Sequence, residues 1–377
     1  MKKEDLNKFI FAGAFVLLGI MLFNSFFVFS VGSKLSTKIE EAKELARPAE
    51  LGLIKIESSC SDCFDIDEVV KVLKDSSDIE IVKEKSLLRN SENAIKIINN
   101  YGIEKLPTIV LAGEIEKASI QNFKQVDDVL VFMNIVAPYE DAITKKIMGK
   151  VSSIMINDKN CEVCTDFSLA INNLKQDGVF IDKEEEFDFS QTKAKELIDK
   201  FSIEKLPALL LSDNIDAYPS IAQSLKQTAS KKQNYYVIES QAPYVETGNG
   251  KIRGLVDLSM LDDSTCLECY DVEIHKSILA RFALAIDEEE KVDISSEKGK
   301  QSISKYDIES APTIILTGDL EVYDNFNIVW PQVGTVEDDG AYVFRTINSM
   351  GIGIVYKDIS TGEIKGLSPT TPTGQSS

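Results

Sequence analysis

The sequence has little of what binds nucleic acid or metal ions. Its 41 lysine and arginine residues are outnumbered by 61 aspartate and glutamate residues, and the net charge of −20 would repel a phosphate backbone. It has one histidine, His275, and only six cysteines. Zinc usually takes four ligands from two close pairs, whereas the cysteine pairs here lie about a hundred residues apart. We therefore expect no nucleic-acid partner, no cofactor and no metal; zinc would require two domains that face each other.

No cysteine stands alone, because all six lie in Cys-x-x-Cys pairs, and none is left to mispair in an oxidising compartment. The pairs are Cys60–Cys63, Cys161–Cys164 and Cys266–Cys269. A proline in a strand-like context follows each first cysteine by 46 or 47 residues, at Pro107, Pro207 and Pro312. One such pair is a weak signal, whereas three with matched prolines indicate one redox-type unit used three times.

The repeat extends beyond the cysteines. Ile103-Glu-Lys-Leu-Pro107 recurs letter for letter as Ile203-Glu-Lys-Leu-Pro207, and Ala137-Pro-Tyr139 recurs as Ala242-Pro-Tyr244. A period of about a hundred residues is too long for a solenoid and suits an array of small domains. The predicted domains are residues 51–148, 149–253 and 254–366.

Within a repeat, the pattern predicts strand, Cys-x-x-Cys, helix, strand, helix, proline and a pair of strands. In the first repeat, residues 51–57 and 79–82 are strand-like, and apolar residues recur at helical spacing after Cys63. Ser91 is placed to cap a second helix, and Pro107 opens the apolar run 108–111. The predicted fold class is α/β, with a mixed sheet and flanking helices in each of three tandem domains.

This arrangement resembles the thioredoxin fold superfamily, and the chain looks like a membrane-anchored tandem relative of the protein disulfide isomerases. The resemblance rests on the strand, Cys-x-x-Cys and helix order, and on the proline that begins an antiparallel strand. It implies attacking thiols at Cys60, Cys161 and Cys266, and resolving thiols at Cys63, Cys164 and Cys269. It also implies cis prolines at Pro107, Pro207 and Pro312 that face the cysteines and bind substrate.

The sites depart from the family pattern. Six residues upstream of the first cysteine, where thioredoxins keep a buried acid, the chain has Ile54, Met155 and Met260. The residues directly before the first cysteines are Ser59, Asn160 and Thr265. These are good N-cap residues, so they predict that a helix begins at each first cysteine and favours its thiolate.

Acidic residues oppose that effect. They lie inside the motifs and three residues before them, at Asp62, Glu162, Glu268, Glu57, Asp158 and Asp263. One such charge at ~7 Å disfavours a thiolate by roughly 0.6 to 2.4 kcal/mol. We therefore expect thiols that are not strongly acidic and disulfides that resist reduction.

The N-terminus changes the cellular context. Residues 9–29 are almost unbroken apolar sequence, and 21 helical residues reach about 31 Å, enough to cross a hydrocarbon core of about 30 Å. We expect a single-pass signal-anchor after a short cytoplasmic tail, residues 1–8, with the domains outside the cytoplasm. A cleaved signal peptide and a buried soluble helix are the alternatives. Residues 30–50 should form a helical stalk, and the Pro, Thr and Ser-rich residues 367–377 a disordered tail.

Several other features are better explained by structure than by chemistry. We expect His275 to be a packing or surface residue on the third repeat's first helix. Asp65, Asp166 and Asp271 follow the second cysteines by two residues and should stabilise a helix's first turn. A longer segment found only in the third repeat, which contains Trp330 and residues 340–343, is expected to be an extra strand and loop.

These observations predict a membrane-anchored, extracytoplasmic thiol-disulfide oxidoreductase of reductase or isomerase type. Its partners would be protein thiol and disulfide substrates, membrane lipid around residues 9–29, and a possible electron donor in the membrane. The competing hypothesis is a non-enzymatic interaction protein whose disulfides stay closed as structural links. That role is less favoured by the short loops, because closing so small a loop stabilises a fold by only about 2 kcal/mol.

Overall fold

The computed structural model describes residues 13, 16–26, 35, 38–40, 42–44, 46–351 and 353–366. The predicted tails 1–8 and 367–377 lie outside these residues, as do both ends of the predicted span 9–29. Residues 16–26 are helical, and so are the described residues between 35 and 46. Ala49 and Glu50, at the end of the predicted stalk 30–50, belong to a strand. Within the described part of the chain, no helix has the length and apolar character needed to cross a membrane.

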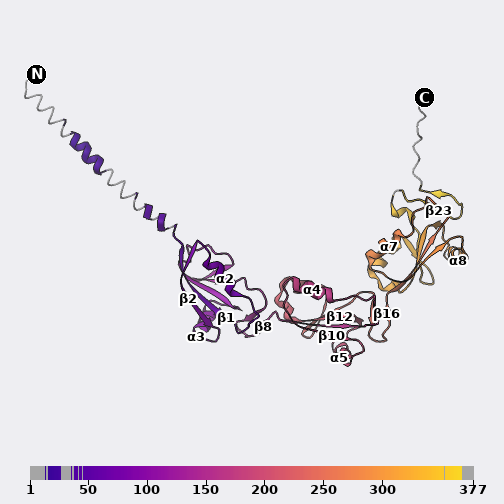
Figure 1. The fold of residues 1–377 in the computed structure, drawn as a ribbon, viewed down its shortest axis with the longest axis horizontal. Helices are drawn as coiled ribbons and strands as arrows, with labels where there is room; N and C mark the ends of the chain where they lie inside the picture. Colours follow the sequence, from indigo (N-terminus) through magenta and orange to yellow (C-terminus); the bar gives the residue numbers. More distant parts are fainter. Residues whose placement is uncertain are drawn as a thin grey trace, which may run out of the picture. The chain divides into compact units, whose positions relative to one another are not determined.

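The chain divides into two compact units, Met1–Met148 and Gly149–Ser377. The first unit contains one repeat, and the second contains the other two. Figure 1 traces the three repeats in sequence order, from indigo to yellow. Each repeat begins with a strand and a Cys-x-x-Cys loop and follows the predicted order of elements.

The first repeat consists of β1 (Ala49–Glu57), α2 (Ile66–Lys74), β2 (Ile79–Leu88), α3 (Glu92–Asn100), β3 (Lys105–Leu106), β4 (Thr108–Gly113), β5 (Phe123–Val126), β6 (Val129–Phe132), β7 (Tyr139–Asp141) and β8 (Ile147–Met148). The second consists of β9 (Val151–Asn157), α4 (Ser168–Gln176), β10 (Ile181–Asp188), α5 (Thr192–Phe201), β11 (Lys205–Leu206), β12 (Ala208–Ser212), the 3-10 helix η1 (Asp213–Ala217), α6 (Pro219–Thr228), β13 (Ser230–Lys232), β14 (Tyr235–Glu239), β15 (Tyr244–Glu246) and β16 (Ile252–Arg253).

The third repeat consists of β17 (Leu255–Asp262), α7 (Ile274–Leu279), η2 (Ala280–Phe282), β18 (Ala285–Asp293), α8 (Glu297–Tyr306), β19 (Ser310–Ala311), β20 (Thr313–Gly318), η3 (Leu320–Val322), α9 (Asp324–Val329), η4 (Trp330–Gln332), β21 (Gly334–Val336), β22 (Tyr342–Phe344), η5 (Ile347–Met350), β23 (Tyr356–Asp358) and β24 (Ile364–Lys365).

Each repeat has a five-stranded mixed sheet. The strand order is β2-β1-β4-β6-β5 in the first repeat, β10-β9-β12-β14-β13 in the second and β18-β17-β20-β22-β21 in the third. The first two strands of each repeat run parallel, and the strand that follows the proline pairs antiparallel with the first strand. Three mixed α/β units of the same order are what the sequence predicts.

The alternation of apolar residues along β1 places a helix on each face of the first sheet. Leu51 and Leu53 pack in a cluster with Ile66 and Val70 of α2. Ile56, on the other face, packs in a second cluster with residues of α3. Successive strand residues point to opposite faces, so both faces of a strand with this pattern must be covered. In Figure 1, α2 and α3 accordingly lie on opposite sides of the sheet.

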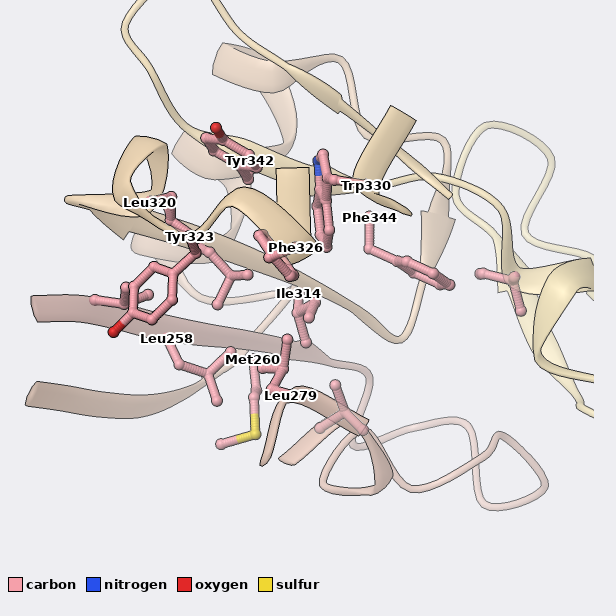
Figure 2. Close-up of a cluster of buried hydrophobic side chains, with 14 residues drawn as sticks. Leu258, Met260, Leu279, Ile314, Leu320, Tyr323, Phe326, Trp330, Tyr342 and Phe344 are labelled. Carbon is pink, nitrogen blue, oxygen red and sulfur yellow. The ribbon is translucent and has the colours of Figure 1, made fainter. Parts of the chain in front are cut away.

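The third repeat differs from the prediction at its long segment. Trp330 lies in the short helix η4, is buried, and packs at a tilt against the rings of Phe326 of α9 and Tyr342 of β22, as Figure 2 shows. The second repeat also has a helix, α6, between its last two long strands. The segment is therefore not restricted to the third repeat and adds no extra strand. Its helical part, α9 and η4, packs on the sheet core, and Tyr342 and Val343 lie in β22, which takes the same place in the sheet as β6 and β14.

A second, three-stranded sheet completes each repeat. Its orders are β3-β7-β8, β11-β15-β16 and β19-β23-β24. The last two strands of each order form a hairpin at the end of the repeat, and the first strand, at the edge of this sheet, holds the two residues before the site proline. The hairpin is therefore brought directly to the edge of the Cys-x-x-Cys site.

Candidate functional site

Each cysteine pair closes a disulfide in the loop between the first strand and the first helix of its repeat. The disulfides are Cys60–Cys63, Cys161–Cys164 and Cys266–Cys269. The two inner residues of each pair are exposed, most of all Leu267, which is 93% exposed. The first cysteines of the second and third pairs are much less accessible, at 8% each.

The helices begin after the cysteine pairs and not at the first cysteines. α2 begins at Ile66, three residues beyond Cys63. α4 and α7 begin still later, four and five residues beyond the second cysteine of their repeats. The prediction that Ser59, Asn160 and Thr265 cap helices that start at the cysteines is therefore wrong. The first thiols do not lie at a helix N-terminus, and the favourable helix charge expected there is missing.

Side chains before the cysteines explain the difference. Asp158 accepts a hydrogen bond from the backbone N–H of Asn160 at 2.9 Å, and Asp263 accepts one from Thr265 at 2.9 Å. Such aspartate turns satisfy the backbone locally and compete with a helix. The Cys-x-x-Cys segment consequently forms a turn between strand and helix.

Two of the helix starts are stabilised instead by the aspartates predicted to do so. Asp65, Asp166 and Asp271 accept hydrogen bonds from the backbone N–H groups two residues further on. The bonds from Ser168 lower the pKa of Asp166 below its ordinary value. Asp65 caps α2, and Asp166 binds the first residue of α4, which confirms the structural interpretation in these two repeats. Asp271 binds Glu273 in the turn that precedes α7.

The site prolines have the predicted conformation. The peptide bonds that precede Pro107, Pro207 and Pro312 are cis. Two further cis bonds precede Pro138 and Pro243 in the repeated Ala-Pro-Tyr segment. The recurrence of that segment was visible in the sequence, but its conformation was not.

Several contacts link the prolines to the cysteine loops. In the second repeat, Cys161 shares a core cluster with Leu206 and Ala208, the neighbours of Pro207. In the third, the hydroxyl of Tyr270, the residue after Cys269, donates to the carbonyl of Pro312 at 2.7 Å. In the second and third repeats, the fold thus brings the proline segment and the cysteine loop together.

The hairpin strand pairs with the residue before each site proline. The antiparallel register matches Leu106 with Glu140, Leu206 with Val245, and Ala311 with Lys357. The backbone N–H of Ala142 also donates to the carbonyl of Glu104, so these two residues form a hydrogen-bonded pair. Such pairs alternate along an antiparallel ladder, so Leu106 and Glu140 form the next one, and the N–H and C=O of Leu106 face the hairpin. A substrate strand would have to use the other edge of β3, and the role of the prolines in substrate binding stays a prediction.

Glu140 is a buried acid that the sequence pattern does not mark as part of the site. It is 1% exposed, and its Oε2 accepts hydrogen bonds from the Ser58 hydroxyl at 2.7 Å and the Ser59 N–H at 2.8 Å. Its Oε1 lies 2.6 Å from Nη1 of Arg89, which is also buried. Burial raises the pKa of Glu140, but the bonds from Ser58 and Ser59 and the Arg89 charge together hold it below its ordinary value.

The third repeat has an ion pair at the corresponding place. Nζ of Lys357 lies 2.6 Å from Oδ2 of Asp263, a carboxylate that is only 4% exposed. Burial raises the pKa of Asp263, and the hydrogen bonds from Lys357 and Thr265 more than offset this, so the pKa is lowered. Comparison of the three hairpin segments in the sequence would mark Glu140 and Lys357 as equivalent positions, since each directly follows a tyrosine that recurs in all three segments.

His275 is a buried packing residue, which is one of the two roles predicted for it. Its ring packs edge-on against Phe344, and its Nε2 lies 3.1 Å from the hydroxyl of Tyr270. Burial lowers the pKa of His275 to about 4 and raises the pKa of Tyr270. His275 is therefore neutral at physiological pH and contacts the cysteine loop through Tyr270.

Known proteins resemble this chain only weakly. No family model and no curated protein matches the sequence. Three solved structures with weak similarity are an alkylhydroperoxide reductase, AhpF, from Enterococcus faecalis (16% identity, 47% of this chain and 88% of that chain, TM-score 0.16), ERdj5 form II (13%, 76% and 39%, TM-score 0.15) and a protein disulfide oxidoreductase from Aeropyrum pernix (15%, 46% and 82%, TM-score 0.14).

Identities and TM-scores this low carry no argument about function. The fold follows from the observed strand orders, the three disulfides and the cis prolines. The three units fit a tandem array of thioredoxin-like domains.

Proposed function

We propose that this chain is a thiol-disulfide oxidoreductase, of reductase or isomerase type, that acts on disulfides of other proteins. The observation that carries the proposal is the repeated site: a redox-active type of cysteine pair in an exposed turn, beside a segment that ends in a proline. The three sites keep this arrangement although the residues inside the pairs differ completely.

The chemistry would proceed by two exchanges. The thiolate of Cys60, Cys161 or Cys266 attacks a substrate disulfide, forms a mixed disulfide and releases one substrate thiolate, which takes up a proton. The second cysteine then attacks the first, closes the disulfide and releases the other substrate thiol. Two electrons pass to the substrate, and a dithiol donor must reopen the disulfide before the next reduction. Isomerisation needs no net electrons, because the released substrate thiolate can attack the mixed disulfide again.

We further propose that residues 9–29 anchor the chain in a membrane, with the three domains outside the cytoplasm. The length of the apolar segment and the absence of an unpaired cysteine support this placement. A membrane-impermeant maleimide added to intact cells that express the full chain, after mild reduction, should label its thiols. Labelling only after the cells are lysed would place the domains inside.

A second candidate function is a binding module whose disulfides remain closed. The low exposure of Cys161 and Cys266 favours this alternative, and so does the hairpin that already pairs with the residue before each proline. In that case Leu267 and the other exposed residues of the turns would contact partners without exchange.

Insulin reduction by dithiothreitol separates the two functions. The full-length chain should accelerate the reduction, and replacement of Cys60, Cys161 and Cys266 by serine together should abolish the acceleration. Single replacements show which sites contribute. A wild-type chain no faster than the triple variant would favour the binding module.

A further inference from the structure

One position differs in charge between three otherwise similar sites. It is the hairpin residue paired with the residue before the site proline, here named the partner position: Glu140, Val245 and Lys357. The register places an acid, an apolar residue and a base at the same point of the same fold. The sites therefore have a common scaffold and different local charge.

In the first repeat, the carboxylate of Glu140 is directed at the cysteine loop. Its Oε2 accepts from Ser58 and Ser59, and the Ser58 hydroxyl oxygen in turn accepts the N–H of Cys60 at 3.0 Å. Arg89 contacts the other oxygen, Oε1. The negative end of the buried pair thus faces Cys60, and the positive end lies on the far side of the carboxylate.

Other charged groups near Glu140 are engaged elsewhere. Nζ of Lys105 lies over the ring of Tyr139 at 4.4 Å, and Asp141 accepts from the turn residue Thr144. On the cysteine loop, Lys55 contacts Glu57 and Asp67. Asp62, inside the motif, adds a further negative charge.

In the third repeat, the charge at the partner position is reversed. The ammonium of Lys357 contacts Asp263 and lies 3.4 Å from Oγ1 of Thr265, the residue before Cys266. Asp263 also accepts from the N–H of Thr265, and its own carbonyl accepts the N–H of Cys266 at 3.0 Å. Lys357 therefore neutralises the buried carboxylate closest to this loop.

Other charged groups around Lys357 are paired with one another. Within the described residues, Asp358 next to it pairs with Lys365, and Lys291 pairs with Asp262. Glu268, inside the Cys-x-x-Cys motif, has a negative charge that opposes the effect of Lys357 on the Cys266 thiolate.

The second repeat has no charge at this position. Val245 belongs to the same apolar cluster as Cys161 and Leu206. The charged residues of its own loop are Asp158, Lys159 and Glu162. This site serves as an internal reference for the other two.

We propose that the partner position holds a positioning residue that sets how readily the first cysteine of its repeat forms a thiolate. Glu140 disfavours the thiolate of Cys60, Val245 leaves that of Cys161 unchanged, and Lys357 favours that of Cys266, since a nearby negative charge opposes an anion and a positive charge stabilises it. The inference rests on the proposed exchange function, and it makes the third site the most reactive at neutral pH and the first the least.

The test is the pH profile of alkylation at each first cysteine in the reduced full-length chain. Peptide mapping after timed exposure to iodoacetamide gives three rates in one sample. Glu140→Gln should accelerate alkylation of Cys60 about tenfold at pH 7, and Lys357→Met should slow that of Cys266 about tenfold. The reason is that one nearby charge changes the equilibrium between thiol and thiolate by about a factor of ten. Lys300→Met, which removes a charge at an exposed position of α8 away from the three sites, is the control and should leave all three rates unchanged.

The shape of the profile separates an electrostatic role from a structural one. A shifted midpoint with an unchanged rate at high pH supports the proposal, whereas a changed rate at every pH indicates a loosened loop and overturns it. Unchanged midpoints, or shifts of equal size at all three cysteines, also overturn it. Because Glu140→Gln leaves Arg89 buried without its partner, the double variant Arg89→Gln, Glu140→Gln is used if the single variant does not fold. It removes both charges of the pair, so it should accelerate alkylation of Cys60 by less than the single variant, because the carboxylate is the nearer of the two charges.

The result is independent of catalysis. Distinct midpoints in a chain that does not reduce insulin would support the positioning role and contradict the proposed function. Identical midpoints in a chain that reduces insulin would contradict the positioning role alone.

Discussion

At the residue scale, the site is built from short polar side chains that hold the backbone. Asp158 and Asp263 fix turns before the cysteines, while two of the aspartates after them stabilise helix starts. This division places the first cysteines in a turn with acidic neighbours and without a helix N-terminus. Both features disfavour a thiolate.

The reduction potentials should reflect these charges. A dithiol whose thiolate is poorly stabilised gives a disulfide that resists reduction, so we predict potentials nearer roughly −270 mV than the roughly −120 mV of a strong oxidant. Equilibration of the full chain with dithiothreitol or glutathione, followed by thiol trapping, measures each site. Values above about −180 mV at all three sites would show that other groups dominate.

His275 makes the third repeat sensitive to acid. Burial lowers its pKa to about 4, so between pH 6.5 and pH 4 the unfolded chain binds more protons than the folded chain. The stability that comes from keeping this histidine neutral is complete above pH 6.5 and is lost as the pH falls towards 4. We predict that the wild type loses roughly 2 to 3 kcal/mol more than His275→Phe between pH 7 and pH 4.

Urea unfolding followed by Trp330 fluorescence reports on this repeat, because Trp330 is the one tryptophan of the sequence and is buried there. His275 is also the one histidine, so the difference between the two chains isolates a single group. Equal pH dependence in both would mean that His275 accepts a proton in the folded state as easily as in the unfolded one.

At the element scale, the second helix starts in the same way in the first and third repeats, whereas α5 of the second repeat has Gln191 at its N-cap and no side-chain cap. Ser91 and Ser296 cap α3 and α8 through the N–H three residues on, at Ala94 and Gly299. A Cβ on Gly299 would collide with the carbonyl oxygen of Asp293 and lie 2.8 Å from the Cα of Ile294. The glycine is needed because α8 approaches the end of β18 too closely for a side chain.

Gly299→Ala should therefore destabilise the third repeat. Alanine favours a helix over glycine by about 1 kcal/mol, but the collision should outweigh this and give a net loss of roughly 1 to 3 kcal/mol. Urea unfolding monitored by Trp330 measures the loss. Lys300→Ala, at the exposed neighbouring position, is the control and should change stability by less than about 0.5 kcal/mol. A stabilised Gly299→Ala chain would show that helix propensity dominates at this position.

Local patterns in the sequence predicted the order of elements and the cysteine loops, because both depend on neighbouring residues. The cis conformation of the prolines was implied by the resemblance to the thioredoxin superfamily and not by a local pattern. The helix starts were misplaced because Ser59, Asn160 and Thr265 are residue types that often cap helices. Only the structure shows that aspartate turns bind the N–H groups of Asn160 and Thr265, and that Glu140 binds that of Ser59. The partner position could not be predicted from one repeat, since Leu106 and Glu140 pair across a long stretch of chain. Such nonlocal pairing leaves no local pattern.

At the scale of the whole molecule, three copies of one site occur in a single chain. The first repeat belongs to one compact unit and the other two share a second, and each repeat contains its own disulfide, proline and hairpin. An array of this kind can contact an extended or misfolded protein at several points, and local attachment of one site raises the effective concentration of the others. We therefore expect the wild type to act on a large client faster than the sum of its single-site variants.

Trapping of a mixed disulfide tests the central claim most directly. A full-length chain with Cys164→Ser, and with the cysteines of the other two repeats replaced by serine, retains the attacking thiol of the second site and cannot resolve the intermediate. After incubation with oxidised insulin, the account predicts a covalent adduct through Cys161 that dithiothreitol releases, and none when Cys161 is also replaced by serine. The corresponding variants at Cys63 and Cys269 should form adducts through Cys60 and Cys266. Failure of all three first cysteines to form an adduct would contradict the account.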